Sequence, residues 1–425
     1  MWTLPFSFTL PGLLLLGTIA CLTVFLSKVI YRLVFHPLSR FPGPKLAAAT
    51  FLYEQYYDIL VSPGGQFSCH LDVLHDKYGP IVRCSPEEIH VRDSEWYEIL
   101  YAGPGHVRDK WERSNRANGS PGSLASAVGH DLHRSRRGAL NPFFSRRMVD
   151  ELEGSIREKV EKLSSGLERC AQQGEIVNLG AASTAMTLDV IAEYSFGKAL
   201  GCLGEENFAP RWKRLMSDIF ESVPVTKHYP IVMKVMSSLP DSWVKVLNPD
   251  MAPMFEARAA IETQAQEIWN EWNRDRKSEK PLDYEEKAKT IFRGILQSNL
   301  PDEEKSLQRM TDEAFVLIVA GGETTARVIT VIFAHLLQDK ALYNRLREVL
   351  SKVCGDGLPP SRVLAEIPLV KAVAQEGTRI ASPVTNRPIL MAPNEDLVYG
   401  DWVIPRGVSK TISPRNLYSK FDSLM

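Results

Sequence analysis

The sequence predicts a mainly α-helical protein with a small β portion and an N-terminal transmembrane helix. Three observations support this prediction. Residues 1–27 contain no charged side chain, residues 79–91 show the short apolar runs of a β-hairpin, and helical spacing of apolar residues dominates from Asp131 onward. The composition, with 44% hydrophobic and 24% charged residues, is typical of a folded globular body.

The N-terminal run is long enough to cross a bilayer, which takes about 20 apolar residues. Pro11 suits the first turn of such a helix, where its missing N–H is not needed. Basic residues follow the run from Lys28 and none precedes it, so the positive-inside rule places the body in the cytosol. A cleaved signal peptide is the alternative, but it requires a basic segment before the apolar core.

The domain organisation that we expect follows from this anchor. Residues 1–27 are the transmembrane helix, residues 28–45 a basic hinge stiffened by Phe41-Pro42-Gly43-Pro44, and residues 46–425 the globular body. The sequon at Asn118 would then lie in the cytosol as an unmodified surface turn.

The body is expected to contain a hairpin over residues 79–91 with its turn at Ser85-Pro86, then a long loop over residues 102–128 that is rich in Gly, Ser, Asn and Pro. Helices are expected at 148–170, 180–195, 208–222, 252–277 and 283–298.

The charge balance and the cysteines exclude some functions. Fifty Lys and Arg residues against 51 Asp and Glu leave a formal charge of −1, so no global field favours nucleic acid as a partner. The six cysteines contain no C-x-x-C pair, so neither a zinc site nor a disulfide framework is predicted.

A central helix is expected from Thr311-Asp312-Glu313 to about Leu337, since a capping residue and two acids suit a helix start. It is apolar nearly all round, which predicts burial. Gly321, Gly322 and Glu323 break this pattern, and such breaks are expected at functional sites. We expect the glycines to permit close approach of a flat ligand or of oxygen. A threonine here can donate to a backbone carbonyl one turn back, or swing its hydroxyl toward a bound ligand and loosen the helix.

A second motif follows about fifty residues later. Ile367-Pro368 begins a predicted helix that carries Glu376-Gly377-Thr378-Arg379. Glu376 and Arg379 are three residues apart, so they lie on one face and can form an ion pair.

Both motifs, in this order and behind a membrane anchor, resemble the cytochrome P-450 superfamily of haem-thiolate monooxygenases. The resemblance extends along nearly the whole chain and implies the cytochrome P-450 fold. Residues 136–145 look most like fungal secondary-metabolism members, several of which oxygenate terpenes. The resemblance therefore implies hydroxylation of a lipophilic small molecule such as a terpenoid.

The resemblance also implies roles for individual residues. Glu323 and Thr324 would be the acid–alcohol pair that delivers protons during catalysis. His133, Arg137 and Arg387 would bind haem b, and Glu376 and Arg379 would be structural. The substrate pocket would be lined by Phe315, Val319, Ala320 and the segment 381–385, which includes Val384.

The implied partners are NADPH-cytochrome reductase, the lipophilic substrate and the endoplasmic reticulum membrane, with a single-pass anchor and the body in the cytosol. No nucleic acid is expected to bind.

One expected element is absent from the sequence. In the family a loop F-x-x-G-x-R-x-C-x-G supplies the cysteine thiolate for the iron, whereas this sequence follows the family pattern to Gly407 and matches poorly from Ser413. Cys354 precedes the second motif and lacks the flanking residues of that loop. We therefore expect a chain truncated before the haem ligand, with no metal ligand, doubtful haem binding and no oxygenase activity. Two alternatives stay open: an active enzyme with a shortened gene model, and a non-catalytic membrane-tethered binding protein.

Overall fold

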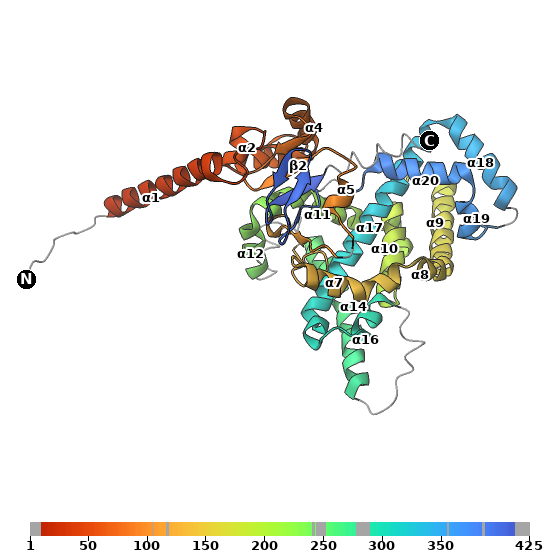
Figure 1. The fold of residues 1–425 in the computed structure, drawn as a ribbon. Helices are drawn as coiled ribbons and strands as arrows, with labels where there is room; N and C mark the ends of the chain where they lie inside the picture. Colours follow the sequence, from red (N-terminus) through yellow and green to blue (C-terminus); the bar gives the residue numbers. More distant parts are fainter. Residues whose placement is uncertain are drawn as a thin grey trace, which may run out of the picture. The chain divides into compact units, whose positions relative to one another are not determined.

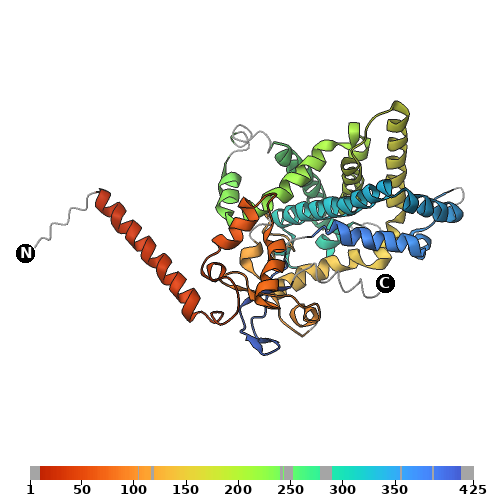
Figure 2. The ribbon, with the colours of Figure 1, turned by 90° about the horizontal axis from the view of Figure 1, so that it is seen from above.

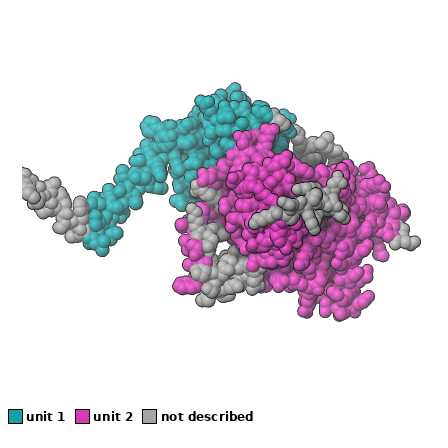
Figure 3. Space-filling model, turned by 90° about the horizontal axis from the view of Figure 1, so that it is seen from below, with its two compact units in different colours: residues 1–111, 386–425 teal, residues 112–385 magenta. Residues whose placement is uncertain are grey.

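The structure, a computed structural model, describes residues 10–103, 105–115, 119–239, 243, 252–277, 290–354, 357–384 and 387–412 (Figure 1). The chain divides into two compact units, which are coloured separately in Figure 3. Unit 1 contains residues 1–111 and 386–425, and unit 2 contains residues 112–385. The part of the chain described is mainly helical with two small sheets, as the sequence predicts.

Unit 1 begins with α1 (Leu10–Ile30), which continues into the π-helical turn η1 (Tyr31–Phe35) (Figure 2). No residue of α1 is buried. Together the two segments are long and apolar enough to cross a membrane. One other described helix, α17 (Leu307–Gln338), meets the same criterion of length and composition.

A buried arginine fixes the segment that follows the N-terminal apolar helix. The side chain of Arg83 is 1% exposed and donates hydrogen bonds to the carbonyls of Arg32, at 2.9 Å, and Pro86, at 2.7 Å. The backbone N–H of Arg83 bonds the Pro42 carbonyl at 2.7 Å. A Cβ at Gly43 would lie 2.4 Å from the Arg83 carbonyl oxygen, so only glycine permits this approach. The proline segment is therefore pinned to the sheet.

The larger sheet of unit 1 has the strand order β1-β2-β7-β4-β3. β1 pairs antiparallel with β2 and aligns Ile81 with Val91, which confirms the predicted hairpin. β2 also pairs in parallel with β7, and this pairing joins the two ends of the chain that make up unit 1. The strands are β1 (Ile81–Arg83), β2 (Glu88–Val91), β3 (Asp109–Lys110), β4 (Leu390–Met391) and β7 (Ser409–Ile412), with a separate pair β5 (Leu397–Tyr399) and β6 (Trp402–Ile404).

Short helices complete unit 1. They are α2 (Lys45–Ala49), α3 (Leu52–Gln55), η2 (Tyr56–Leu60), α4 (Phe67–Tyr78) and α5 (Tyr97–Leu100).

Unit 2 is a helical bundle whose centre is the contact between α10 (Leu179–Phe196) and α17, with α14 (Ala252–Lys277) and α20 (Pro368–Ala381) also packed on α17 (Figure 1). The other helices are α6 (Glu112–Asn115), α7 (His130–Leu140), η4 (Asn141–Phe144), α8 (Arg146–Glu151), α9 (Glu153–Gln173), η5 (Cys202–Gly204), η6 (Glu206–Phe208), α11 (Pro210–His228), α12 (Pro230–Ser238), α16 (Ile291–Gln297), η8 (Asp302–Lys305), α18 (Lys340–Cys354) and α19 (Ser361–Ala365).

Most predicted helices are confirmed, with shifted ends. The ranges 180–195 and 252–277 correspond to α10 and α14. The range 148–170 is divided at Leu152 into α8 and α9, and the range 208–222 extends to His228 in α11. The predicted helix at 283–298 is seen as α16, and its residues 283–289 lie outside the described residues, as does Asn118.

The predicted start of the central helix is wrong. α17 begins at Leu307, four residues before Thr311. Asp312 and Glu313 do not serve its first turn, because both are buried and accept hydrogen bonds from the backbone of the loop before α7. Asp312 Oδ2 lies 2.7 Å from the Gly122 nitrogen, and Glu313 Oε2 lies 3.0 Å from the Leu124 nitrogen.

The burial predicted for the whole central helix is correct only for part of its residues. Met310, Ala314 and Ile318 are fully buried, whereas Phe333 is 47% and Leu337 58% exposed.

Two buried histidines join α4 to β2 in unit 1. His75 Nε2 lies 2.6 Å from His90 Nδ1, and His75 Nδ1 lies 2.8 Å from the Gly79 carbonyl oxygen. The carbonyl can only accept, so His75 donates to it and receives the proton of His90 Nδ1 on its other nitrogen. His90 Nε2 is then left as a buried acceptor without a hydrogen-bond partner.

This arrangement suits two neutral imidazoles. Burial lowers the pKa of His90 well below its usual value, and the charges of His75, Arg387 and Arg92 add to the effect. Burial also lowers the pKa of His75, against the hydrogen bond to Gly79, which raises it.

We predict that the free energy of unfolding falls as the pH decreases below about 6.5. Above that value both histidines are neutral in the folded and unfolded chain. Below it the unfolded chain binds protons that the folded chain cannot, at up to about 1.4 kcal/mol per pH unit for each histidine. Urea unfolding between pH 7 and pH 5 measures the slope. The variant His90→Phe should flatten the slope, whereas His106→Gln, at a half-exposed histidine, should leave it unchanged. A slope equal in all three proteins would contradict the assignment.

Candidate active site

The glycine–threonine motif of α17 lies against α10. A Cβ at Gly322 would lie 2.5 Å from Leu188 Cδ2, and a Cβ at Gly321 would lie 2.7 Å from Ile191 Cγ1. Both distances are shorter than real Cβ atoms allow, so the glycines are needed for the close packing of the two helices. The expectation that they admit a flat ligand is therefore corrected: the side on which their Cβ atoms would project is already filled by Leu188 and Ile191.

Glu323 forms an ion pair with a residue that the sequence did not single out. Its Oε1 lies 2.5 Å from Lys213 Nζ on α11, and the Glu323 side chain is 13% exposed. Its Oε2 is buried without a hydrogen-bond partner. Lys213 lies 110 residues earlier in the chain, and no local pattern marks it, because only the packing of α11 on α17 brings it to this carboxylate.

Thr324 is adjacent to this acid and points its hydroxyl back along the helix. Thr324 Oγ1 donates to the Ala320 carbonyl at 2.8 Å, as the sequence analysis expected for a threonine at this position. The structure thus places a carboxylate with one unpaired oxygen and a hydroxyl bonded to its own helix on consecutive residues.

The predicted pocket residues are distributed over two segments. Phe315, Val319 and Ala320 lie on α17 within five residues of one another, which spans about one and a half turns. Phe315 and Val319 are half-buried and Ala320 is exposed. Arg258 of α14 lies over the Phe315 ring at 5.6 Å. Val384 lies on the segment after α20 and is 56% exposed.

Glu376 and Arg379 pair on α20 as their spacing predicts. Arg379 donates to Glu376 through two hydrogen bonds, Nε to Oε2 at 2.7 Å and Nη2 to Oε1 at 2.5 Å. The hydrogen bonds from Arg379 lower the pKa of Glu376. Between the two residues, a Cβ at Gly377 would lie 2.1 Å from Ile332 Cγ1, so this glycine permits the contact of α20 with α17.

On α7 the buried arginine is the neighbour of the one predicted. Arg137 is exposed and His133 half-buried. Arg136 is buried and forms a two-point ion pair with Glu304, with distances of 2.6 and 3.0 Å, and donates to the Ser123 carbonyl at 2.9 Å. Helical spacing allows only one of two consecutive arginines to face the bundle, and the sequence does not say which.

Arg387 lies in unit 1, where two carboxylates already balance its positive charge. Its Nη2 lies 2.8 Å from Glu54 Oε1 and 3.2 Å from Glu88 Oε2, and the guanidinium covers the Phe67 ring at 4.7 Å. Burial lowers the pKa of Arg387, but the charges of Glu88 and Glu54 outweigh it and hold the pKa above its usual value. Two carboxylates against one guanidinium leave these three side chains without a net positive charge for a further anion.

The residues described do not fit a haem with a thiolate ligand. Arg387, one of the expected propionate partners, is bound by two buried glutamates. Burial raises the pKa of the Cys84 and Cys202 thiols, which disfavours a thiolate. Cys170 is also buried, Cys21 lies in α1, and neither Cys69 nor Cys354 belongs to the family's cysteine loop. We therefore assign no step of a reaction to the haem.

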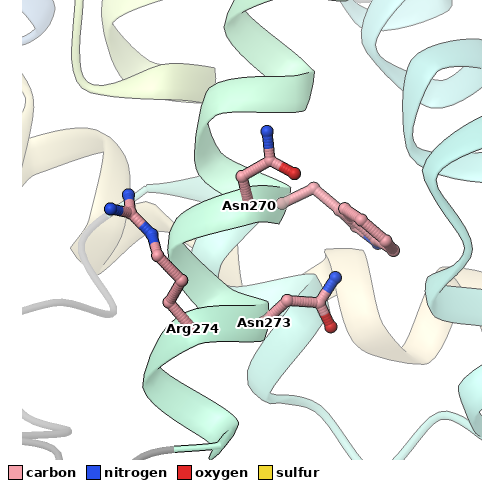
Figure 4. A pocket seen from close by; sticks show the side chains of 4 residues that line it. Asn270, Asn273 and Arg274 are labelled. Atoms are coloured by element: carbon pink, nitrogen blue, oxygen red, sulfur yellow. The ribbon is translucent and has the colours of Figure 1, made fainter.

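One surface pocket lies elsewhere in unit 2. It is lined by Trp269, Asn270, Asn273 and Arg274 of α14, and none of the predicted site residues contributes to it (Figure 4).

Comparison with known proteins shows which family the chain matches. A model of the Cytochrome P450 family matches residues 55–418. The chain is similar to conidiogenone synthase PchP450 of Penicillium rubens, with 37% identity over 93% of this chain and 77% of the relative. It is also similar to the N-acetyltryptophan 6-hydroxylase ivoC of Emericella nidulans, with 34% identity over 95% of this chain and 77% of the relative.

A solved structure, the retinoic acid bound cyanobacterial CYP120A1, is similar with a TM-score of 0.60 and 19% identity over 90% of this chain and 78% of that chain. At that identity the likeness concerns the fold alone.

We predict that Gly322→Ala destabilises unit 2 by about 1–3 kcal/mol, because its methyl group must displace Leu188 in a closely packed contact. Chemical unfolding followed by circular dichroism measures the change. Gly154→Ala is the matched control: Gly154 is an exposed helical glycine of α9 with no atom near its Cβ position, so that change should stabilise the helix by up to about 1 kcal/mol. Equal effects at the two glycines would show that packing on α10 is not the constraint.

Proposed function

Because the chain belongs to the cytochrome P450 family, we propose that unit 2 carries the substrate-facing and proton-donating residues of a monooxygenase of fungal secondary metabolism. The observation that supports this most directly is the adjacent pair Glu323 and Thr324 on α17. Its substrate would be a lipophilic small molecule, such as a terpenoid, that is hydroxylated.

The acid–alcohol pair has the chemistry of a short proton relay. Glu323 Oε1 is paired with Lys213, which holds the carboxyl group in place, and Oε2 has no hydrogen-bond partner, so it is free to accept a hydrogen bond or a proton. The Thr324 hydroxyl can exchange the Ala320 carbonyl for a ligand. A positioned acid of this kind contributes to rate when it lies within hydrogen-bond reach of the reacting group.

Apolar side chains near this pair support a lipophilic substrate. Phe315, Val319 and Ala320 precede the pair on the same helix, and we assign Val384 to the same pocket. The relatives differ in what their names imply, since one is a conidiogenone synthase and another acts on N-acetyltryptophan. Apolar residues alone do not separate a terpenoid from an aromatic substrate, so both belong in a binding assay.

The membrane helix supports a location on the endoplasmic reticulum. We propose that α1 crosses that membrane once, that the body lies in the cytosol, and that NADPH-cytochrome reductase is the electron donor. His133, Arg137 and Arg387 are each proposed to bind a haem propionate. Glu376 and Arg379 are proposed to be structural.

A second candidate is a membrane-tethered binding protein without catalysis. The observation that favours it is the pairing of Arg387, one of the expected propionate partners, with Glu54 and Glu88. This candidate keeps the pocket but not the oxygenation.

We predict that Ala320→Phe abolishes ligand binding, because the new ring fills the space beside Thr324. The assay is the rise in melting temperature of the full chain in detergent on addition of a terpenoid, tryptophan or N-acetyltryptophan. Ala334→Phe, the same change at another exposed position of α17, should keep the full shift. If both variants bind as the unchanged protein does, the pocket lies elsewhere.

We also predict that the 425-residue chain, expressed with an ample supply of haem, lacks the haem-thiolate band in a reduced carbon-monoxide difference spectrum. The reason is the missing thiolate, since this ligand defines the electronic state of the iron in the family. A full haem-thiolate band would contradict the expectation that none of the six cysteines supplies the thiolate. It would favour the monooxygenase over the binding protein.

A further inference from the structure

A threonine of α10 makes a hydrogen bond to the glycine–threonine motif that nothing in the sequence indicated. Thr187 Oγ1 lies 2.6 Å from the carbonyl oxygen of Gly322. Two carbonyls of its own helix are farther away, Ser183 at 3.0 Å and Thr184 at 3.2 Å. A hydroxyl has one proton to donate, and its nearest acceptor is the carbonyl on the neighbouring helix.

The carbonyl of Gly322 therefore has two donors. Within the α-helix it also accepts from the amide of Ala326, four residues later. Thr187, Gly322 and Ala326 are all buried, so water does not compete for this oxygen. The Thr187 hydroxyl of α10 and the Ala326 amide of α17 donate to the same oxygen. This oxygen belongs to the residue that directly precedes Glu323 and Thr324.

The second donor lowers the free energy needed to break the helical hydrogen bond between Gly322 and Ala326. When a helical hydrogen bond breaks in a buried place, its carbonyl is normally left unsatisfied, which costs about 1–3 kcal/mol. Here the carbonyl of Gly322 keeps the Thr187 hydroxyl when the Ala326 amide leaves. Inserted or competing donors of this kind are a recognised cause of local bends in helices.

We propose that Thr187 is a positioning residue that allows α17 to open locally between Gly322 and Ala326. The inference rests on the proposed function and deepens it, because the segment that opens carries Glu323 and Thr324, whose hydroxyl donates to the Ala320 carbonyl in the closed helix. Thr187 holds the Gly322 peptide against α10 while the residues after it rearrange.

A merely structural role for the same bond has different consequences. If Thr187 only ties two helices together, its loss weakens the bundle and speeds every local opening of α17. If it satisfies the carbonyl in the open form, its loss weakens the bundle but makes the opening at Ala326 rarer. The two roles therefore predict opposite changes in amide exchange at one place.

The experiment is hydrogen–deuterium exchange of the full chain in detergent without any cofactor, followed by mass spectrometry of peptides that cover residues 322–330. Thr187→Val removes the hydroxyl and keeps the shape. We expect slower exchange in these peptides by about fivefold, the change that loss of about one hydrogen bond produces. In the same variant we expect a lower midpoint of urea unfolding.

Two further variants serve as controls. Thr187→Ser keeps the hydroxyl and should restore exchange to the rate of the unchanged protein. Thr184→Val removes a buried hydroxyl of the same helix that has no hydrogen-bond partner, so it should neither lower the stability nor slow exchange at residues 322–330 selectively. Thr187→Cys, a weak donor, replaces Thr187→Val if the latter does not fold.

Faster or unchanged exchange in Thr187→Val would overturn the proposal, as would failure of Thr187→Ser to restore it. None of these results depends on ligand or haem binding. A failed binding assay with Ala320→Phe would therefore count against the proposed function and leave the inference on Thr187 standing.

Discussion

The close contact of α10 with α17 is the constraint on which unit 2 depends. Gly321 and Gly322 remove the side chains that would hold the helices apart, and Leu188 and Ile191 fill the space. Because interiors are close-packed, even one methyl group at this contact must displace a neighbour. The same contact places Thr187 on the Gly322 carbonyl and presents Glu323 and Thr324 on the residues that follow. Packing and chemistry thus rest on the same two glycines.

Three buried arginines, Arg83, Arg136 and Arg387, have different kinds of hydrogen-bond partner. Arg83 donates hydrogen bonds to backbone carbonyls and so holds the segment after α1 in place. Arg136 pairs with Glu304 and orients α7 in unit 2. Arg387 is enclosed by Glu54 and Glu88 in unit 1. Removing one partner of such a buried pair costs far more than the pair contributes, so Arg387 is held firmly in its present role.

The family match and the cysteines in the sequence lead to different expectations about the haem. The family model covers residues 55–418, and the residues expected to face substrate and oxygen lie on α17, except for Val384. The thiolate that the family's chemistry requires is not offered by any of the six cysteines in the sequence. What these residues offer is a proton-holding pair, with Lys213 fixing the acid, next to an apolar helix surface. The proposed roles in binding and proton transfer therefore rest on residues of α17 and its neighbours.

The sequence by itself determined the elements, because periodicity and motif are local properties. The membrane helix, the hairpin at residues 79–91, the ranges of α10 and α14 and the pairing of Glu376 with Arg379 all follow from spacing along the chain. It did not determine which arginine of α7 is buried or where α17 begins, since Arg136 and Glu313 are recruited by partners distant in sequence. Only the tertiary structure brought Lys213 to Glu323, Thr187 to Gly322 and two glutamates to Arg387. These contacts join residues more than a hundred positions apart, and the free energy that selects them comes from packing between elements, which no local pattern contains.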